Sequence, residues 1–279
     1  MFKIALNAGH GLNTLGKRCK KSLDPNQTRE WTLNNRICEK IEIKLRQYNG
    51  YNLMRLDDPT GKKDIALKTR TKNANNFGAD FYLSIHHNAG INGGTGGGIE
   101  TYIYTKASKA SEEWQNALYS ALIKHTGLKG NRADGTRKAN LHECRESNAP
   151  CVLIECGFMD SKTDVPIILT DKFAEQVADA CVEVLAEKGG LKKVEAKKAY
   201  SGTFPKLPVK GYFKKGDKGA QVGNLQKFLN WYGKYNLDVD NSFGAKTEAA
   251  VKKFQKSEKL EIDGCFGAAS LKAAKAIKK

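Results

Sequence analysis

The sequence predicts an α/β fold, a mainly parallel twisted sheet flanked by helices on both faces, followed by a small all-α module of three helices. Two observations lead to this prediction. Through residues 1–188, short apolar segments alternate with longer segments of helical periodicity, which is typical of parallel sheets covered on both faces. Further along, the segment 240–247 is echoed 23 residues later by 263–270, and each copy is a turn that leads into a short helix.

Short apolar segments mark the strands of the predicted sheet, at residues 2–9, 51–56, 81–86, 99–104 and 152–155. Apolar residues at helical spacing predict the helices between them, at 28–47, 65–77 and 107–126, with a closing helix around 173–185. Active sites of such folds lie beyond the carboxyl ends of the parallel strands. We therefore expect His10, His86 and Glu155, each at the end of an apolar segment, to meet at one edge of the sheet.

Composition divides the chain into three parts. Residues 1–188 form the predicted α/β domain. Residues 189–210 lack apolar periodicity, are rich in lysine and end with two prolines, so they are predicted to be a linker. Residues 211–279 contain the repeat and three short amphipathic helices, which is enough for one small core.

The formal net charge is +17, and its excess lies toward the C-terminal end. Residues 206–279 hold 16 Lys and Arg against 7 Asp and Glu, whereas residues 1–190 hold 27 against 22. Such a charge favours a polyanionic partner, which could be nucleic acid, an anionic membrane surface or an anionic cell wall. No apolar run approaches the roughly 18 residues of a membrane span. The seven cysteines include no Cys-x-x-Cys pair, which argues against a disulfide framework and a thiolate zinc site.

The tripeptide Gly9-His10-Gly11 follows the first apolar segment directly. The glycines are expected to let the backbone turn sharply and to leave room around the imidazole. A histidine held in this way is a candidate metal ligand. The alternative is a histidine in an ordinary strand-to-loop turn.

Glu30 and His86 complete a candidate set of three metal ligands with His10. A catalytic zinc site uses three such ligands and keeps a fourth position for water. Glu30 falls in the first turn of a predicted helix, where the helix dipole would favour a carboxylate without any metal. His87 could take the place of His86, because only one of two neighbouring strand residues can point to the site.

The other two histidines are weaker candidates for metal ligands. His142 is a candidate contact to the substrate or to a ligand, and His125, at the end of a predicted helix, is expected on the surface.

Glu155 is the most informative single residue, because it follows a run of apolar residues that would be buried. A buried carboxylate must be paired or functional. Near a metal-activated water it could accept a proton and pass it to a leaving amine. The alternative is a structural salt bridge with Arg145 or Arg70.

Four motifs occur in order along residues 1–188: Asn7-Ala-Gly-His10-Gly, Glu30-x-x-Leu33-Asn34, Asp80-x-x-x-Ser84-Ile-His86-x-Asn88-Ala and Leu141-x-x-x-Arg145-x-x-x-x-Pro150-x-x-Leu153-x-Glu155-x-Gly157-Phe158. Together they resemble the zinc-dependent N-acetylmuramoyl-L-alanine amidases of the amidase_3 type, which include autolysins and phage endolysins. The sequence departs from the family pattern at Ala8, where proline is usual, and at Cys156, where a larger apolar residue is common. Neither position is a candidate ligand.

The resemblance implies a function for each candidate residue. It implies that His10, Glu30 and His86 bind Zn²⁺ and that Glu155 is the catalytic acid/base. Zinc-activated water would then hydrolyse the amide bond between N-acetylmuramic acid and the L-alanine of peptidoglycan, which lyses the bacterial cell wall.

Residues 211–279 resemble the peptidoglycan_binding_1 module through Gly216-Asp217-x-Gly219, Phe243-Gly244-x-x-Thr247 and Asp263-Gly264-x-Phe266-Gly267. This second resemblance implies the same polymeric partner, with neither nucleic-acid binding nor stable membrane association. Met1-Phe2-Lys3 leads directly into the first predicted strand, so no signal peptide is expected. These features fit a phage-type endolysin that is made in the cytoplasm and reaches the wall through a separate membrane pore.

Two other functions remain open at this point. A zinc peptidase that cuts within the stem peptide would use similar ligands. A basic protein that binds nucleic acid would explain the charge, although lysines far outnumber arginines in residues 206–279 and no nucleic-acid motif occurs there.

Overall fold

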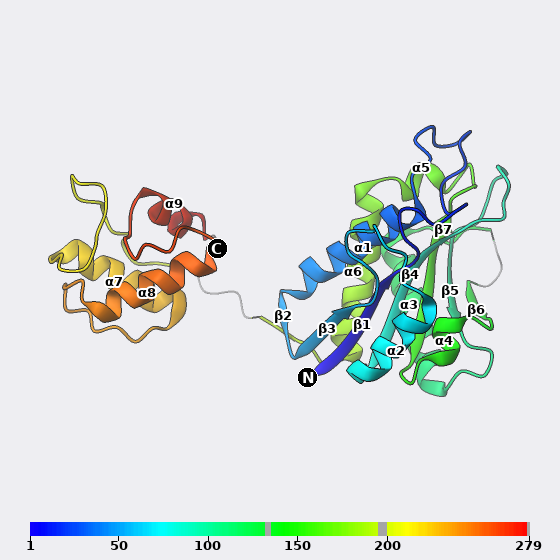
Figure 1. Ribbon diagram of the computed structural model, residues 1–279, viewed down its shortest axis with the longest axis horizontal. Helices are drawn as coiled ribbons and strands as arrows, with labels where there is room; N and C mark the ends of the chain where they lie inside the picture. Colours follow the sequence, from blue (N-terminus) through cyan, green and yellow to red (C-terminus); the bar gives the residue numbers. More distant parts are fainter. Residues whose placement is uncertain (132–134, 195–199, 278–279) are drawn as a thin grey trace. The chain divides into compact units, whose positions relative to one another are not determined.

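The computed structural model describes residues 1–131, 135–194 and 200–277 (Figure 1). The chain divides into two compact units, Met1–Val194 and Glu195–Lys279, and each has its own hydrophobic core. The first unit contains the large sheet, and the second contains the helices α7, α8 and α9. Within the described ranges, no helix combines the length and apolar character needed to cross a membrane.

A six-stranded sheet forms the centre of the first unit. Its strands are, in spatial order, β3 (Tyr51–Arg55), β1 (Phe2–Ala8), β4 (Phe81–Asn88), β7 (Cys151–Phe158), β5 (Ile99–Ile103) and β6 (Thr136–Lys138). The first four are parallel to one another, so their carboxyl ends meet at one edge. β5 runs antiparallel to β7, and β6 is parallel to β5.

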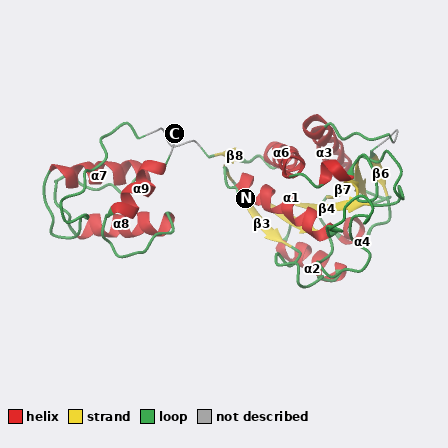
Figure 2. Ribbon diagram, turned by 90° about the horizontal axis from the view of Figure 1, so that it is seen from above, coloured by secondary structure: helices red, strands yellow, loops and turns green. Residues whose placement is uncertain are grey.

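The sheet is covered on both faces because alternate side chains of its strands point to opposite sides. From β1, Ile4 and Leu6 enter the larger core, whereas Ala5 enters a smaller core on the other face. The larger core is covered by α1 (Glu30–Leu45), α3 (Lys109–Thr126) and α6 (Asp171–Lys188), and the smaller core by α2 (Leu67–Phe77) and α4 (His142–Glu146). Figure 2 shows α3 and α6 on one side of the sheet and α2 on the other.

The predicted fold class is confirmed, since the sheet is mostly parallel and has helices on both faces. The strands that carry the candidate site differ from the prediction in length. β4 continues past His86 to Asn88, and β7 continues past Glu155 to Phe158. Both residues therefore lie inside strands and not at their ends, because the residues that follow them are also buried and extend the strands.

Several short elements have no counterpart in the prediction. They are α4, β6, α5 (Val165–Ile168) and a two-stranded sheet of β2 (Tyr48–Asn49) and β8 (Lys192–Lys193). Each has at most five residues, which is too few to show a helical or strand period.

Both ends of the segment 189–210, which is predicted to be a linker, make contacts with the unit next to them. Lys192–Lys193 forms β8 and pairs with β2. Tyr200, Phe204 and Leu207 pack against the core of the second unit. Residues 195–199, in the middle of the predicted linker, and 278–279, at the end of the predicted module, lie outside the described residues.

The sequence repeat of the second unit is also a structural repeat. The described helices of this unit are α7 (Ala220–Gly233), α8 (Ala245–Ser257) and α9 (Ala268–Ala276). Gln226 of α7 donates to Asp240 Oδ1 (2.8 Å), and Gln255 of α8 donates to Asp263 Oδ1 (2.6 Å). Each glutamine also donates to a backbone carbonyl of the same turn, so in both copies a buried helix side chain fixes the turn that follows it.

Candidate metal centre and active site

The loop after β1 holds His10 in a constrained conformation. His10 has φ 66°, in the left-handed region that residues other than glycine rarely adopt and that is often found at functional sites. Arg70 of α2, which is buried, donates to the carbonyl oxygens of Ala8 (2.8 Å) and His10 (3.0 Å) and also pairs with Asp64 (3.0 Å). One arginine thereby fixes the backbone turn that presents the imidazole.

Three of the predicted site residues come together beside this loop. His10 Nε2 lies 3.4 Å from Glu30 Oε1, and His86 Nδ1 lies 3.2 Å from the same oxygen. One ligand atom from each residue lies within 4.8 Å of the other two. The two imidazole rings are 5.0 Å apart and nearly perpendicular, which lets both present a nitrogen to one point. The arrangement is a candidate metal centre.

Glu30 lies in the first turn of α1 but is not a solvated helix-start carboxylate. Its side chain is 1 % exposed. Oε1 accepts a hydrogen bond from the backbone N–H of His87 (3.2 Å). Oε2 is buried, accepts no hydrogen bond from the described part of the chain and forms a long ion pair with Lys17 Nζ (3.6 Å). Burial would raise the pKa of Glu30, but contacts with His10 and His86 hold it well below its usual value. The carboxylate is therefore charged and turned toward the two histidines.

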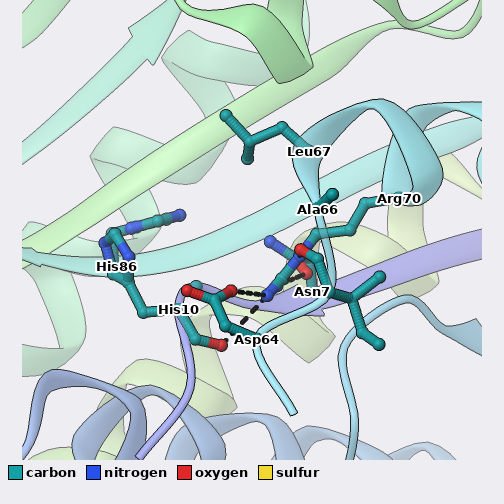
Figure 3. Close-up of a pocket in the computed structure, with 9 residues that line it drawn as sticks. Asn7, His10, Asp64, Ala66, Leu67, Arg70 and His86 are labelled. Atoms are coloured by element: carbon teal, nitrogen blue, oxygen red, sulfur yellow. Dashed lines mark hydrogen bonds and ion pairs between the residues drawn. The ribbon is translucent and has the colours of Figure 1, made fainter. Parts of the chain in front are cut away.

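A hollow of about 330 Å³ opens beside the two histidines. Figure 3 shows His10 and His86 next to each other on one side of it and Asn7, Asp64 and Arg70 together on the other. Ala66 and Leu67 add apolar surface where α2 begins. The candidate metal centre thus borders a space that can accept part of a substrate.

Gly9 allows the histidines to lie this close. A Cβ atom on Gly9 would overlap the imidazole of His86. The sequence predicts that this glycine makes room for the imidazole of His10. In the structure the glycine makes room for the imidazole of His86. The positive φ is likewise found at His10 itself.

We expect Gly9→Ala to destabilise the metal-free protein by about 1–3 kcal/mol, because the added methyl group overpacks a buried ring. It should also weaken metal binding, since His86 must move. Urea unfolding and chelator competition measure the two effects. Gly244→Ala is a control, because Gly244 has φ −86° and no atom near the added methyl group. Wild-type stability and metal affinity in Gly9→Ala would contradict this prediction.

Glu155 lies beside His86 on the neighbouring strand, where the two are paired in the register of β4 and β7. Parallel neighbours in register point to the same face of a sheet. The Oε2 atom of Glu155 is buried and has no hydrogen-bond partner among the described residues. Burial raises the pKa of Glu155 to about 7, with His86 lowering it and Glu30 raising it. Such a carboxyl group can both take up and release a proton near neutral pH.

The two arginines considered as structural partners of Glu155 are engaged elsewhere. Arg70 pairs with Asp64, and Arg145 pairs with Glu146 on the surface (2.7 Å).

The structure adds one residue to the site, Glu143 of α4. Its Oε2 atom lies 3.5 Å from His86 Nε2, on the side of the ring opposite Glu30. Burial would raise the pKa of Glu143, but His86 and Tyr82 lower it to about 2. The sequence gives little sign of this residue, because α4 has only five residues and the neighbouring His142 is the more conspicuous candidate.

The remaining histidines lie outside the cluster. His87 is buried on the α1 side, where its Nδ1 atom contacts Asn34 Oδ1 (2.7 Å), and burial lowers the pKa of His87 to about 3. His142 contacts Thr71 Oγ1 (3.3 Å), and His125 contacts Glu183 (2.7 Å). His86, and not His87, therefore joins the candidate metal centre.

Comparison with known families agrees with the geometry of this site. Residues 4–187, about two thirds of the chain, match the Amidase_3 family model, described as N-acetylmuramoyl-L-alanine amidase. The chain belongs to the Amidase_3 family. Residues 218–273 match the PG_binding_1 model of peptidoglycan binding domains. The chain is thus a hydrolase of the N-acetylmuramoyl-L-alanine amidase type, and its partner is the peptidoglycan of the cell wall.

Curated relatives of this amidase come from bacteria and from a phage. It is 32 % identical over 216 residues to a sporulation-specific N-acetylmuramoyl-L-alanine amidase of Bacillus subtilis, covering 75 % of this chain and 77 % of the relative. It is 30 % identical over 197 residues to an endolysin of Bacillus phage SPP1, covering 71 % and 67 %.

Solved structures show the same fold as the amidase domain. The N-acetylmuramoyl-L-alanine amidase of Clostridium difficile 630 is 32 % identical with a TM-score of 0.60, over 67 % of this chain and 95 % of the other. The catalytic domain of CwlV from Bacillus (Paenibacillus) polymyxa var. colistinus is 26 % identical with a TM-score of 0.60, over 69 % and 100 %.

Proposed function

We propose that this amidase holds a zinc ion through His10, Glu30 and His86 and uses Glu155 as its acid/base. In this way it would hydrolyse the amide bond between N-acetylmuramic acid and L-alanine. The observation that carries the proposal is the spacing of the three candidate ligands. Neighbouring ligand atoms in a tetrahedral zinc site with bonds of about 2.0–2.1 Å are about 3.3 Å apart. The two imidazole nitrogens lie 3.4 Å and 3.2 Å from Glu30 Oε1.

The chemistry of the donors supports zinc as well. Two imidazoles and one carboxylate match the ligands of catalytic zinc sites. The Oε2 atom of Glu30 is a buried acceptor with no hydrogen-bond partner among the described residues, and Lys17 Nζ lies 3.6 Å away, too far for a hydrogen bond, so a cation at the centre would satisfy it. Zinc, when bound, supplies Lewis-acid chemistry that polarises a carbonyl group and makes water more acidic.

Glu155 would move the proton during the reaction. As a carboxylate it accepts a proton from the attacking water, and as a carboxylic acid it returns that proton to the nitrogen of the departing L-alanine. Its raised pKa, about 7, matches this exchange at neutral pH. Arg70 contributes by fixing the His10 turn and so keeps the site in one geometry.

For the domain organisation we propose a catalytic domain at 1–188, a linker at 189–210 and a peptidoglycan-binding module at 211–279. A module that stays attached to the wall raises the local concentration of substrate around the catalytic domain. The relative from phage SPP1 supports an endolysin-type role, in which the chain is made in the cytoplasm and reaches the wall through a separate phage-encoded pore.

Digestion of purified cell walls tests the proposed bond. We expect turbidity to fall, new N-terminal L-alanine to appear, and both to stop with a chelator and resume when zinc is added back. A peptidase that cuts within the stem peptide would expose a different N-terminal residue and leave muramic acid substituted. Appearance of that other residue would contradict the proposed cleavage site.

A further inference from the structure

Glu143 contacts the candidate metal centre from the side opposite Glu30. Glu143 is 3 % exposed and is carried by α4, on the face of the sheet that α1 does not cover. The imidazole of His86 lies between two carboxylates, with Nδ1 3.2 Å from Glu30 Oε1 and Nε2 3.5 Å from Glu143 Oε2.

The carboxylate of Glu143 is held in place by donors from two strands. Asn7 Nδ2 and Tyr82 OH donate to Oε1, at 2.7 Å and 2.6 Å. Ser84 donates to Oε2, the oxygen that faces His86, at 3.2 Å. All of these side chains are buried, so the oxygen is presented to the imidazole by a rigid polar network.

This arrangement bears on which ring nitrogen of His86 would carry the proton when a cation occupies the centre. A neutral imidazole has one N–H group and one lone pair. Both carboxylates only accept, so each favours a proton on the nitrogen that it faces. A cation held by Glu30 and His10 would need the lone pair of Nδ1, and Glu143 would then keep the proton on Nε2. The distance of 3.5 Å is long for a hydrogen bond. Nε2 has no hydrogen-bond partner among the described residues, so no competing bond holds it away from Glu143.

We infer that Glu143 is a positioning residue that fixes the tautomer and orientation of His86 for metal binding. The inference rests on the proposed zinc site. Carboxylates that hold the second nitrogen of a metal-bound histidine commonly contribute 10–100-fold to metal affinity. The alternative is that Glu143 only stabilises the fold through Asn7, Tyr82 and Ser84.

The first test measures zinc affinity of the full chain by competition with a chromophoric chelator. We expect Glu143→Gln to weaken zinc binding by about 10–100-fold and to shift the visible spectrum of the cobalt-substituted protein. Tyr82→Phe removes a donor to Glu143 Oε1 but keeps the hydrogen bond of Ser84 to Oε2 and the contact with His86. It should therefore lower the melting temperature of the metal-free protein and weaken zinc binding less than Glu143→Gln does. Asp164→Asn is a matched control, because Asp164 is a buried carboxylate that accepts hydrogen bonds only outside the metal centre.

The second test needs no variant and stays decisive if Glu143→Gln does not fold. In zinc-loaded wild type labelled with ¹⁵N-histidine, NMR should show zinc on Nδ1 and the proton on Nε2 of His86. Zinc on Nε2 would overturn the inference, as would wild-type zinc affinity and cobalt spectrum in Glu143→Gln. If the wild-type chain binds no zinc, the proposed metal site itself fails, which is a different result.

Discussion

Replacing Glu155 by glutamine is expected to lower kcat on purified cell walls by about 10²–10⁴-fold while zinc remains bound. Glutamine keeps the shape of the side chain but cannot accept the proton of the attacking water. The effect should fall on kcat and not on KM, because substrate binding does not require the proton transfer. Turbidity loss, together with the zinc content of the purified variant, measures both parts of the prediction.

Glu100→Gln is the matched control for this experiment. Glu100 is a buried carboxylate paired with Glu155 in the register of β5 and β7, and it accepts hydrogen bonds from Arg137 (2.8 Å) and Asn88 (3.0 Å). Its replacement should lower the free energy of unfolding, and it should lower kcat much less than Glu155→Gln does. If Glu155→Gln lysed walls as fast as wild type, another residue would have to move the proton.

Replacing His86 by alanine is expected to abolish measurable lysis and the response of the protein to zinc. A ligand that binds only the folded state stabilises it by about 2.7 kcal/mol at a concentration of 100 times Kd. Added zinc should therefore raise the melting temperature of the chelator-treated wild type but not of His86→Ala. Differential scanning calorimetry with and without zinc measures this difference without any substrate.

His125→Ala provides the comparison for a histidine outside the centre. His125 lies near the end of α3 and pairs with Glu183 on the surface, so its loss should leave both the zinc response and lysis intact. A zinc-dependent rise in melting temperature that persisted in His86→Ala would show that the metal binds elsewhere.

The sequence predicts the fold class because buried positions recur at regular spacing along each helix and strand, and these positions are apolar. β1 and β7 are apolar on both faces, as a covered parallel sheet requires, and α1 and α6 carry apolar faces at helical spacing. The spacing of apolar residues does not reveal whether a strand runs parallel or antiparallel to its neighbour. β5 is as buried as its neighbours whichever way it runs, so its antiparallel pairing with β7 comes only from the structure.

The sequence predicts those residues of the candidate site that stand out from their neighbours in the chain. His10 and Glu155 are recognisable because a polar group follows a run of apolar ones. Glu143 is not, because its importance comes from contacts with Asn7 and His86, which are far away in the chain. The positive φ of His10 cannot be read from the sequence either, since the turn is held by hydrogen bonds from Arg70, 60 residues further along the chain.

The strand order has a consequence for the sequence of events during folding. The three proposed metal ligands lie within the first 86 residues, on or beside the neighbouring strands β1 and β4 and at the start of α1. Glu155 joins them only when β7 pairs with β4, a contact that links Ile85 to Ile154, 69 residues further along the chain. The pairing of β1 with β4, which brings His10 to His86, spans a similar length of chain, since Ile4 pairs with Phe81, 77 residues further along. Pairings of such long range form slowly, because the entropy of closing a long loop opposes them. We therefore expect a partly folded chain to lack both the assembled metal ligands and the proton acceptor, so that metal binding and hydrolysis begin only once the middle of the sheet has closed.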